Sequence, residues 1–232
     1  MHTTVKTLLI AFAAFAANPA IAAGDIFGVW SPRGQTITFS ATDPQFKQPD
    51  DMPMLPSTLE KFRKTKSGYG PHATPDSEDP TFQCYPPGMP LILLIPFPVE
   101  IIEARDRLIM YFEFSNLMRQ IYMDGRAHPA DLQPTYMGHS TGKWEGDTLV
   151  VDTVGLTDKS WLDRAGHPHS DALHIVERIR RIDKETLEID LSFDDAKAYA
   201  KPWKGKKLFT HRPGWEIMEY VCADNFKKPA AK

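Results

Sequence analysis

From residue 99 onward, short apolar stretches alternate with tight-turn signals, and this pattern restricts the possible fold more than any other feature. It predicts nine strands, over residues 99–104, 108–114, 117–123, 140–144, 148–154, 173–182, 187–193, 206–211 and 215–222. Most of the links are short and rich in the Asp, Asn, Gly and Pro residues that favour hairpins. Parallel βαβ units are disfavoured, because their crossovers need about a dozen residues or more.

A series of strands this long is expected to close on itself, because closure removes the exposed strand edges. The sequence therefore predicts an all-β fold, an antiparallel meander closed into an up-and-down, calycin-like barrel, with a β-sandwich as the alternative. Residues 31–90 are irregular and rich in proline, and we expect them to wrap the barrel. One short helix is expected over residues 57–66, with Ser57 as N-cap and Glu60 as its capping-box partner.

The first 22 residues have the layout of a secretory signal peptide. Lys6 precedes a short apolar run, and A-I-A ends at Ala22. The run is shorter than the roughly 20 residues that a membrane-spanning helix needs. We therefore expect residues 1–22 to be removed on export to the periplasm or medium. Residues 23–232 are expected to form a single β-barrel domain, with the wrap at 31–90 and the meander at 97–222.

The charge balance argues against two classes of partner. Lys and Arg number 27 against 30 Asp and Glu, which gives a formal net charge of −3 without a basic run. Nucleic acid and membrane are therefore not expected as partners, and a small-molecule ligand is. No cofactor is expected, and the oligomeric state stays open. The two cysteines, Cys84 and Cys222, suit a disulfide in an oxidising compartment, but the sequence does not show that they are close enough.

Two links are too long to be tight turns, residues 124–137 and 155–172. Two predicted strands separate the links, and in an antiparallel meander two strands return the chain to the same end. Long loops at one end of a barrel commonly carry binding and catalysis. We therefore expect Arg126 and His128, from the first link, to lie near Asp163, His167 and His169 from the second.

Two charged residues fall on otherwise apolar strand faces. Residues 173, 175, 177 and 179 share one face, which is apolar except for Glu177. Arg119 has the same position on the strand at 117–123. Because an unpaired buried charge is costly, the pattern predicts an Arg119–Glu177 pair inside the barrel. A structural ion pair and a role toward a ligand both remain open.

The histidines of the second long link suggest acid–base chemistry. A histidine titrates near neutral pH, and a carboxylate such as Asp163 or Glu177 can orient it. His167 and His169 are therefore the candidate catalytic bases, with Asp163 and Glu177 as their partners.

Two other chemistries were weighed for the same region. His167, His169 and His174 could ligate a metal together with Asp163 or Asp171, but Pro168 makes this a loop and no second motif completes a ligand set. No metal is therefore predicted. The letters G-H-S-T-G at residues 138–142 match a serine nucleophile elbow, but they lead into a strand rather than a helix.

Several motifs carry a resemblance to known proteins. The G-x-W of Gly28 and Trp30 resembles the start of lipocalins and related calycins, in which the Trp closes one end of the barrel. Four segments resemble a widespread group of exported bacterial proteins of unassigned function. They are D-P-x-x-x-C-x-P-P-G at 79–88, D-G-R-x-H-P at 124–129, G-x-S-x-G-x-W-E-G-D-T-L-V-V-D-T at 138–153 and G-x-P-H-S-x-x-L-H-x-x-E-R at 166–178. The resemblance implies export and a single domain, and it carries no catalytic role.

Together these features predict an exported β-barrel that binds a small, partly apolar molecule in its mouth. The walls would come from aromatic residues and the polar contacts from charged residues and histidines. The proposed walls are Phe82, Tyr85, Trp144 and Trp161, and the proposed contacts are Arg119, Arg126, His128, His174 and Glu177. The alternative is a periplasmic lyase, isomerase or hydrolase on the same scaffold. In it, His167 or His169 would act as acid–base, and Arg119 or Arg126 would stabilise an anion.

Overall fold

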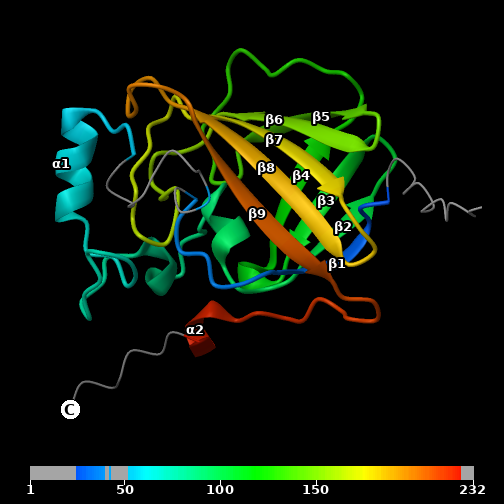
Figure 1. Cartoon of the computed structure of the whole chain (residues 1–232), viewed down its shortest axis with the longest axis horizontal. Coiled ribbons are helices and arrows are strands. Elements are labelled where there is room, and N and C mark those ends of the chain that lie inside the picture. The colour runs from blue at the N-terminus through cyan, green and yellow to red at the C-terminus, as the bar shows by residue number, and fades with distance from the viewer. Residues whose placement is uncertain (1–24, 40–41, 43–51, 226–232) are drawn as a thin grey trace, which may run out of the picture.

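The computed structural model describes residues 25–39, 42 and 52–225 (Figure 1). Nine strands form a closed barrel in their chain order, which confirms the predicted all-β barrel. The strands are β1 (Gly28–Pro32), β2 (Val99–Glu103), β3 (Arg107–Phe112), β4 (Leu117–Tyr122), β5 (His139–Glu145), β6 (Thr148–Val154), β7 (His174–Arg181), β8 (Thr186–Asp194) and β9 (Trp203–His211). The predicted signal peptide, residues 1–22, lies outside the described residues.

One pair of neighbouring strands departs from the predicted antiparallel meander. β4 and β5 run parallel, with Ile121 opposite Ser140 and Tyr122 opposite Thr141. The other neighbouring pairs in the barrel are antiparallel. A parallel pair needs a long link, and residues 123–138 supply it. The link at 124–137 therefore starts at the opposite end of the barrel from the link at 155–172. Because β5 and β6 are antiparallel as predicted, the two links still meet, through the bridge between Thr135 and Leu156.

The strand predicted at residues 215–222 is not formed. β9 already pairs with β8 on one side and with β1 on the other, so the closed ladder offers no free edge. After β9 the chain runs over the outside instead, with Trp215 and Met218 exposed by 52% and 70%. The described part of the chain ends in α2 (Cys222–Asn225), below the barrel in Figure 1.

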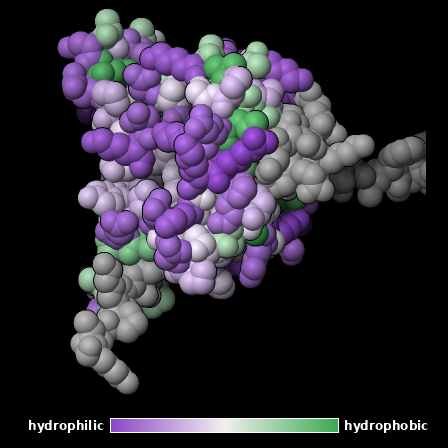
Figure 2. All heavy atoms as spheres, turned by 90° about the vertical axis from the view of Figure 1, so that its left-hand side faces the viewer, coloured by the Kyte–Doolittle hydropathy of each residue, from purple (hydrophilic) through white to green (hydrophobic). Residues whose placement is uncertain are grey.

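The one longer helix is α1 (Pro56–Lys64), close to the predicted position. The predicted capping box is wrong. The N-cap is Leu55, and Pro56 takes the first helical position, where a missing N–H is tolerated. Glu60 instead accepts a hydrogen bond from Lys64 at 2.7 Å, one turn further on. Phe62 is buried beneath the helix, while the side of the molecule that carries α1 shows a mostly hydrophilic surface (Figure 2).

The segments around the barrel are short and tightly packed. Among the described residues these include three 3-10 helices, η3 (Pro80–Gln83), η4 (Leu91–Leu94) and η5 (Phe114–Asn116). All four residues of η4 are buried. Cys84, which follows η3, forms a disulfide with Cys222 across a Cα–Cα distance of 5.7 Å. The pairing that the sequence left open is therefore present, and it joins the proline-rich region to the C-terminal segment.

The barrel interior is apolar with few exceptions. On β7, Ile175, Glu177 and Ile179 are buried, while Arg178 between them is exposed, as the alternation predicted. The inward aliphatic residues of neighbouring strands include Ile101, Met110, Val151, Ile189 and Leu191. Any charge among them must bring its own partner, since burying an unpaired charge is costly.

Candidate functional site

The Arg119–Glu177 pair predicted from the strand pattern is present inside the barrel. The two residues are exposed by only 1% and 0%. Nη1 of Arg119 donates to Oε1 of Glu177 at 3.0 Å, and Nη2 donates to Oε2. This two-pronged geometry matches the fork of the guanidinium to the carboxylate.

Two hydroxyl groups complete the network around this pair. Nε of Arg119 donates to Ser140 Oγ at 3.1 Å, and Nη2 donates to Thr153 Oγ1 at 2.8 Å. The two hydroxyls also lie 3.0 Å from each other. The four side chains come from four successive strands, β4 to β7, so the network ties these strands together. A role of Arg119 or Glu177 toward a ligand stays a prediction, since the network leaves neither side chain exposed.

Asp163 and His167, two predicted catalytic residues, form a hydrogen-bonded pair in the β6–β7 link. Nδ1 of His167 lies 2.7 Å from Asp163 Oδ2. The other carboxylate oxygen accepts the backbone N–H groups of Ala165 and His167, at 3.1 and 3.3 Å. Phe62 of α1 stacks on the His167 ring, with centroids 4.0 Å apart, and both members of the pair are fully buried. The orientation suits an acid–base pair, but α1 covers it.

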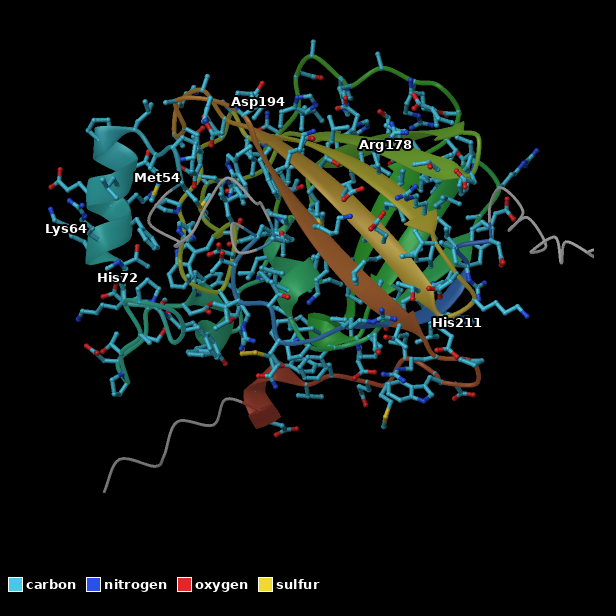
Figure 3. All side chains as sticks on the ribbon, in the orientation of Figure 1. Met54, Lys64, His72, Arg178, Asp194 and His211 are labelled. Atoms are coloured by element: carbon cyan, nitrogen blue, oxygen red, sulfur yellow. A yellow bond between two sulfur atoms is a disulfide. The ribbon has the colours of Figure 1, made fainter. Side chains whose placement is uncertain are left out.

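His169 is also buried and has a different partner. Its Nδ1 lies 3.0 Å from the carbonyl oxygen of Ser170, which can only accept, so Nδ1 carries the proton. Its Nε2 then accepts from the Ser160 hydroxyl at 3.1 Å. Burial lowers the pKa of His169, which favours this neutral form. Nearby, His72 contacts the edge of Phe62 and lies just below the Lys64 end of α1 (Figure 3); its buried Nε2 has no partner among the described residues.

His128 and His174 join a third group, on the outer wall of the barrel. Both Nε2 atoms lie 3.0 Å from Oδ1 of Asp152. Nδ1 of His128 lies 2.8 Å from Nδ1 of His139. Burial lowers the pKa of His139, and the neighbouring His128 lowers it further. His128 thus lies against Asp152 and His139 rather than against the Asp163–His167 pair.

The remaining predicted contacts and walls are spread over the molecule. Arg126 is exposed, pairs with Asp124 through Nε at 2.8 Å and lies over the Tyr122 ring. Trp144 and Trp161 are half-buried and Tyr85 is exposed. Of the four predicted wall residues, Phe82 alone lines the cavity described next.

A cavity of about 300 Å³ lies among the segments that surround the barrel. All of its lining residues lie outside the strands. Five are aromatic, three are aliphatic or proline, and three are polar: Tyr69, Phe82, Phe97, Phe114 and Tyr220; Leu91, Ile95 and Pro96; Asp79, Thr81 and Arg164. The cavity is therefore an aromatic chamber with one acid and one base in its wall.

Asp79 is 3% exposed and uses only one of its oxygens. Oδ1 accepts the Thr81 backbone N–H at 2.8 Å and the Thr81 hydroxyl at 2.7 Å, which caps η3. Oδ2 accepts no hydrogen bond within the described part of the chain. Burial raises the pKa of the Asp79 carboxyl, and the Thr81 hydrogen bonds and the Arg164 charge offset this only in part.

Arg164 has unused hydrogen-bonding groups as well. Its guanidinium lies over the Tyr69 ring, 3.6 Å from the centroid. Among residues 25–39, 42 and 52–225 its side chain makes no hydrogen bond and no ion pair. Stacking holds the guanidinium plane while its N–H edges stay available, as in many sites that recognise carboxylates.

Neither Asp79 nor Arg164 was predicted from the sequence to be a site residue. A signal existed for each of them. Asp-Pro-Thr at 79–81 is a typical helix start, with the acid as N-cap and Pro at the first position, and Arg164 lies in a link already marked as long. The chamber also needs Tyr220, which lies two residues before Cys222 of the disulfide that the sequence left open.

The described residues show neither a metal centre nor a membrane-spanning helix. Among them, no group of three or more His, Cys, Asp or Glu side chains is arranged to hold a metal ion. None of the helices in this part of the chain has the length and apolar character needed to cross a bilayer. Comparison with protein-family models, with curated proteins and with solved structures finds no match to the chain.

Proposed function

We propose that this protein binds a small, partly apolar molecule in the aromatic cavity. The observation that carries the proposal is the unused hydrogen-bonding capacity of Asp79 and Arg164 in an otherwise largely apolar wall. Asp79 Oδ2 and the Arg164 guanidinium have no hydrogen-bond partner within the described residues, so a ligand that pairs with them gains binding free energy. Ligand sites generally combine apolar walls with a few such polar groups.

This site differs in place from the barrel mouth expected from the sequence. The predicted polar cluster is divided among the interior Arg119–Glu177 pair, the Asp163–His167 pair under α1 and the outer histidines around Asp152. None of these residues lines the cavity. The kind of function predicted is kept, while its location moves to the segments outside the strands.

Export is part of the same proposal. The signal-peptide pattern of residues 1–22 and the resemblance to exported bacterial proteins support it. The Cys84–Cys222 disulfide supports it too, because disulfides persist in oxidising compartments and are rare in the cytosol.

An enzymatic function is the second candidate, favoured by one observation. The 2.7 Å hydrogen bond between His167 and Asp163 is the arrangement of an acid–base pair. A substrate could reach it only if α1 moved away from the His167 ring. Binding in the cavity needs no such movement, and it is therefore the function we favour.

The test is a screen of small molecules by thermal shift, with hits measured by calorimetry. Ile95 lines the cavity and is 7% exposed, so Ile95→Trp should fill it; Ile102 on β2 is 37% exposed and does not line it, so Ile102→Trp is the matched control. A ligand at 100 times its Kd is expected to stabilise the wild type by about 2.7 kcal/mol. The stabilisation should persist in the control and vanish in Ile95→Trp. Phe82→Ala, which enlarges the cavity, should change the affinity if Ile95→Trp folds poorly.

The proposal fails if hits stabilise Ile95→Trp and Phe82→Ala as strongly as the wild type. It also fails if the screen yields no ligand at all.

A further inference from the structure

We propose that the ligand of this cavity is an aromatic carboxylate that also carries a hydrogen-bond donor. Its carboxylate would bind Arg164, its donor would bind Asp79, and its ring would lie among the aromatic walls. The assignment rests on the proposed function and names the class of molecule that the same cavity selects.

The first argument is the state of Arg164. Its five N–H donors are unused within the part of the chain that the structure describes, and its plane is fixed by stacking on Tyr69. A carboxylate can accept two parallel hydrogen bonds from one edge of such a guanidinium. A neutral carbonyl or hydroxyl group would accept fewer hydrogen bonds from Arg164 and would not balance its positive charge.

The second argument is the sign of the local charge. Lys207 is buried on β9, where Nζ donates to the backbone oxygen of Arg33 at 3.1 Å. Burial lowers the pKa of Lys207 to about 8, and the positive charge of Arg164 contributes to the shift. Asp79 is the one acid that lines the cavity. Lys207 does not line the cavity, but its charge and that of Arg164 are close enough to repel each other, and an anionic ligand bound to Arg164 relieves this repulsion.

The third argument is the free oxygen of Asp79. Thr81 occupies Oδ1 with two hydrogen bonds, so Oδ2 is the oxygen left for a ligand. Oδ2 of the ionised carboxylate can only accept, so it selects a hydroxyl or an N–H group. A ligand with a carboxylate alone would leave this oxygen unpaired.

The fourth argument is the shape of the walls. Phe97, Phe114 and Tyr220 contact one another, with ring centroids 4.7 to 5.5 Å apart. Phe82 and Tyr69 also line the cavity. Rings stack or meet edge to face with such a surface, and this adds to the area that a flat ligand buries.

The test compares three probes by calorimetry at pH 7 on the full chain. They are 4-hydroxyphenylacetate, phenylacetate, which lacks the donor, and 2-(4-hydroxyphenyl)ethanol, which lacks the carboxylate. The first is expected to bind most tightly, and loss of either group to weaken binding at least about tenfold.

Two variants separate the roles of the two residues. Arg164→Gln is expected to weaken both acids at least about tenfold and to leave the alcohol unchanged. In Asp79→Asn the amide oxygen must face the Thr81 donors, so the NH2 group faces the cavity and cannot accept from a hydroxyl. This variant should bind 4-hydroxyphenylacetate no better than phenylacetate. Arg178→Gln, on the outer face of β7 (Figure 3), is the control and should bind all three probes as the wild type does.

The outcomes separate this inference from the proposed function. If the alcohol binds as tightly as the acids, or if Arg164→Gln leaves the acids unchanged, the carboxylate assignment is overturned while binding in the cavity stands. If none of the probes binds but screened neutral compounds bind and are lost in Ile95→Trp, the class of ligand is again overturned alone. If the screen also fails, the proposed function is overturned together with this inference.

Discussion

The interior ion pair offers the sharpest test of how this barrel is stabilised. Arg119 and Glu177 lie among aliphatic side chains with almost no exposure, joined by two parallel hydrogen bonds. The change we consider is the removal of each charge alone and of both together. The variants are Arg119→Met, Glu177→Leu and the double replacement.

The expected magnitudes follow from the burial of the pair. Removing one partner leaves the other charge without compensation, and such single changes cost about 3–5 kcal/mol. Removing both takes away the desolvation cost as well as the attraction, so the double variant is expected to lie within about 2 kcal/mol of the wild type. Ser140 and Thr153 can then bond to each other across their 3.0 Å separation. The double variant should therefore be more stable than either single variant.

The assay is urea unfolding of the four proteins, followed by circular dichroism and tryptophan fluorescence. In a thermal melt, each single change should lower Tm by roughly 10 °C, because about 1 kcal/mol corresponds to 2–4 °C for a domain of this size. The matched control is the pair formed by Arg178 and Glu145, with its 2.9 Å contact and both side chains partly exposed. Replacing Glu145 with Ala should cost less than about 1 kcal/mol.

The reasoning would be refuted by either of two results. One is a loss below about 1 kcal/mol for both single variants, which is the range of exposed pairs. The other is a double variant whose loss equals the sum of the single losses, because independent sites add and coupled sites do not.

Three further predictions concern the backbone, the cross-link and pH. Gly166 has φ +89°, and a β-carbon there would lie 2.5 Å from the methyl carbon of Thr65. Gly125 has a similar φ of +75°, but a β-carbon there would meet no atom within 4 Å. Gly166→Ala should therefore cost at least about 1 kcal/mol more than Gly125→Ala in urea unfolding, and equal costs would contradict this. Replacing Cys84 and Cys222 with Ser should lower the free energy of unfolding by about 2–5 kcal/mol, since the cross-link spans 138 residues; unchanged melting would show that it adds no stability. Burial and a neighbouring guanidinium lower the pKa of Lys207 from 10.5 to about 8, so the folded state binds this proton more weakly than the unfolded state does. The free energy of unfolding should therefore rise by up to roughly 3 kcal/mol between about pH 8 and pH 10.5, and Lys207→Met should lack this rise.

Strand periodicity made much of the barrel predictable. The alternation of apolar and polar residues on β4 and β7 predicted that Arg119 and Glu177 point inward. Because an unpaired buried charge is costly, it also predicted that the two pair with each other. The parallel β4–β5 pair was not predictable in this way, because the irregular link between these strands carries no signal for where it returns. The strand expected at residues 215–222 failed for a related reason. Its local pattern suits a strand, but an already closed ladder has no edge to receive it.

The site was less predictable than the fold. Histidines and carboxylates close in sequence suggested one cluster. His167 and Asp163 do pair within their own link, but His128 and His174 lie against Asp152 on β6 instead. The cavity depends on side chains that are far apart along the chain, from Tyr69 to Tyr220. Such a chamber is formed by the packing of loops, and loop sequences have no regular periodicity from which their contacts could be predicted.

The Cys84–Cys222 disulfide links the proposed ligand binding to the oxidation state of the chain. Tyr220 forms part of the chamber wall, and Cys222, two residues later, is held to Cys84, two residues after Phe82. Both Tyr220 and Cys222 follow all nine strands in the chain, and the cross-link forms only where thiols are oxidised. A newly made chain with reduced cysteines has every strand of the barrel but lacks the covalent anchor of one wall. The proposed ligand binding would thus belong to the oxidised protein, and under the proposed export the chain would cross a reducing compartment with the chamber still unanchored.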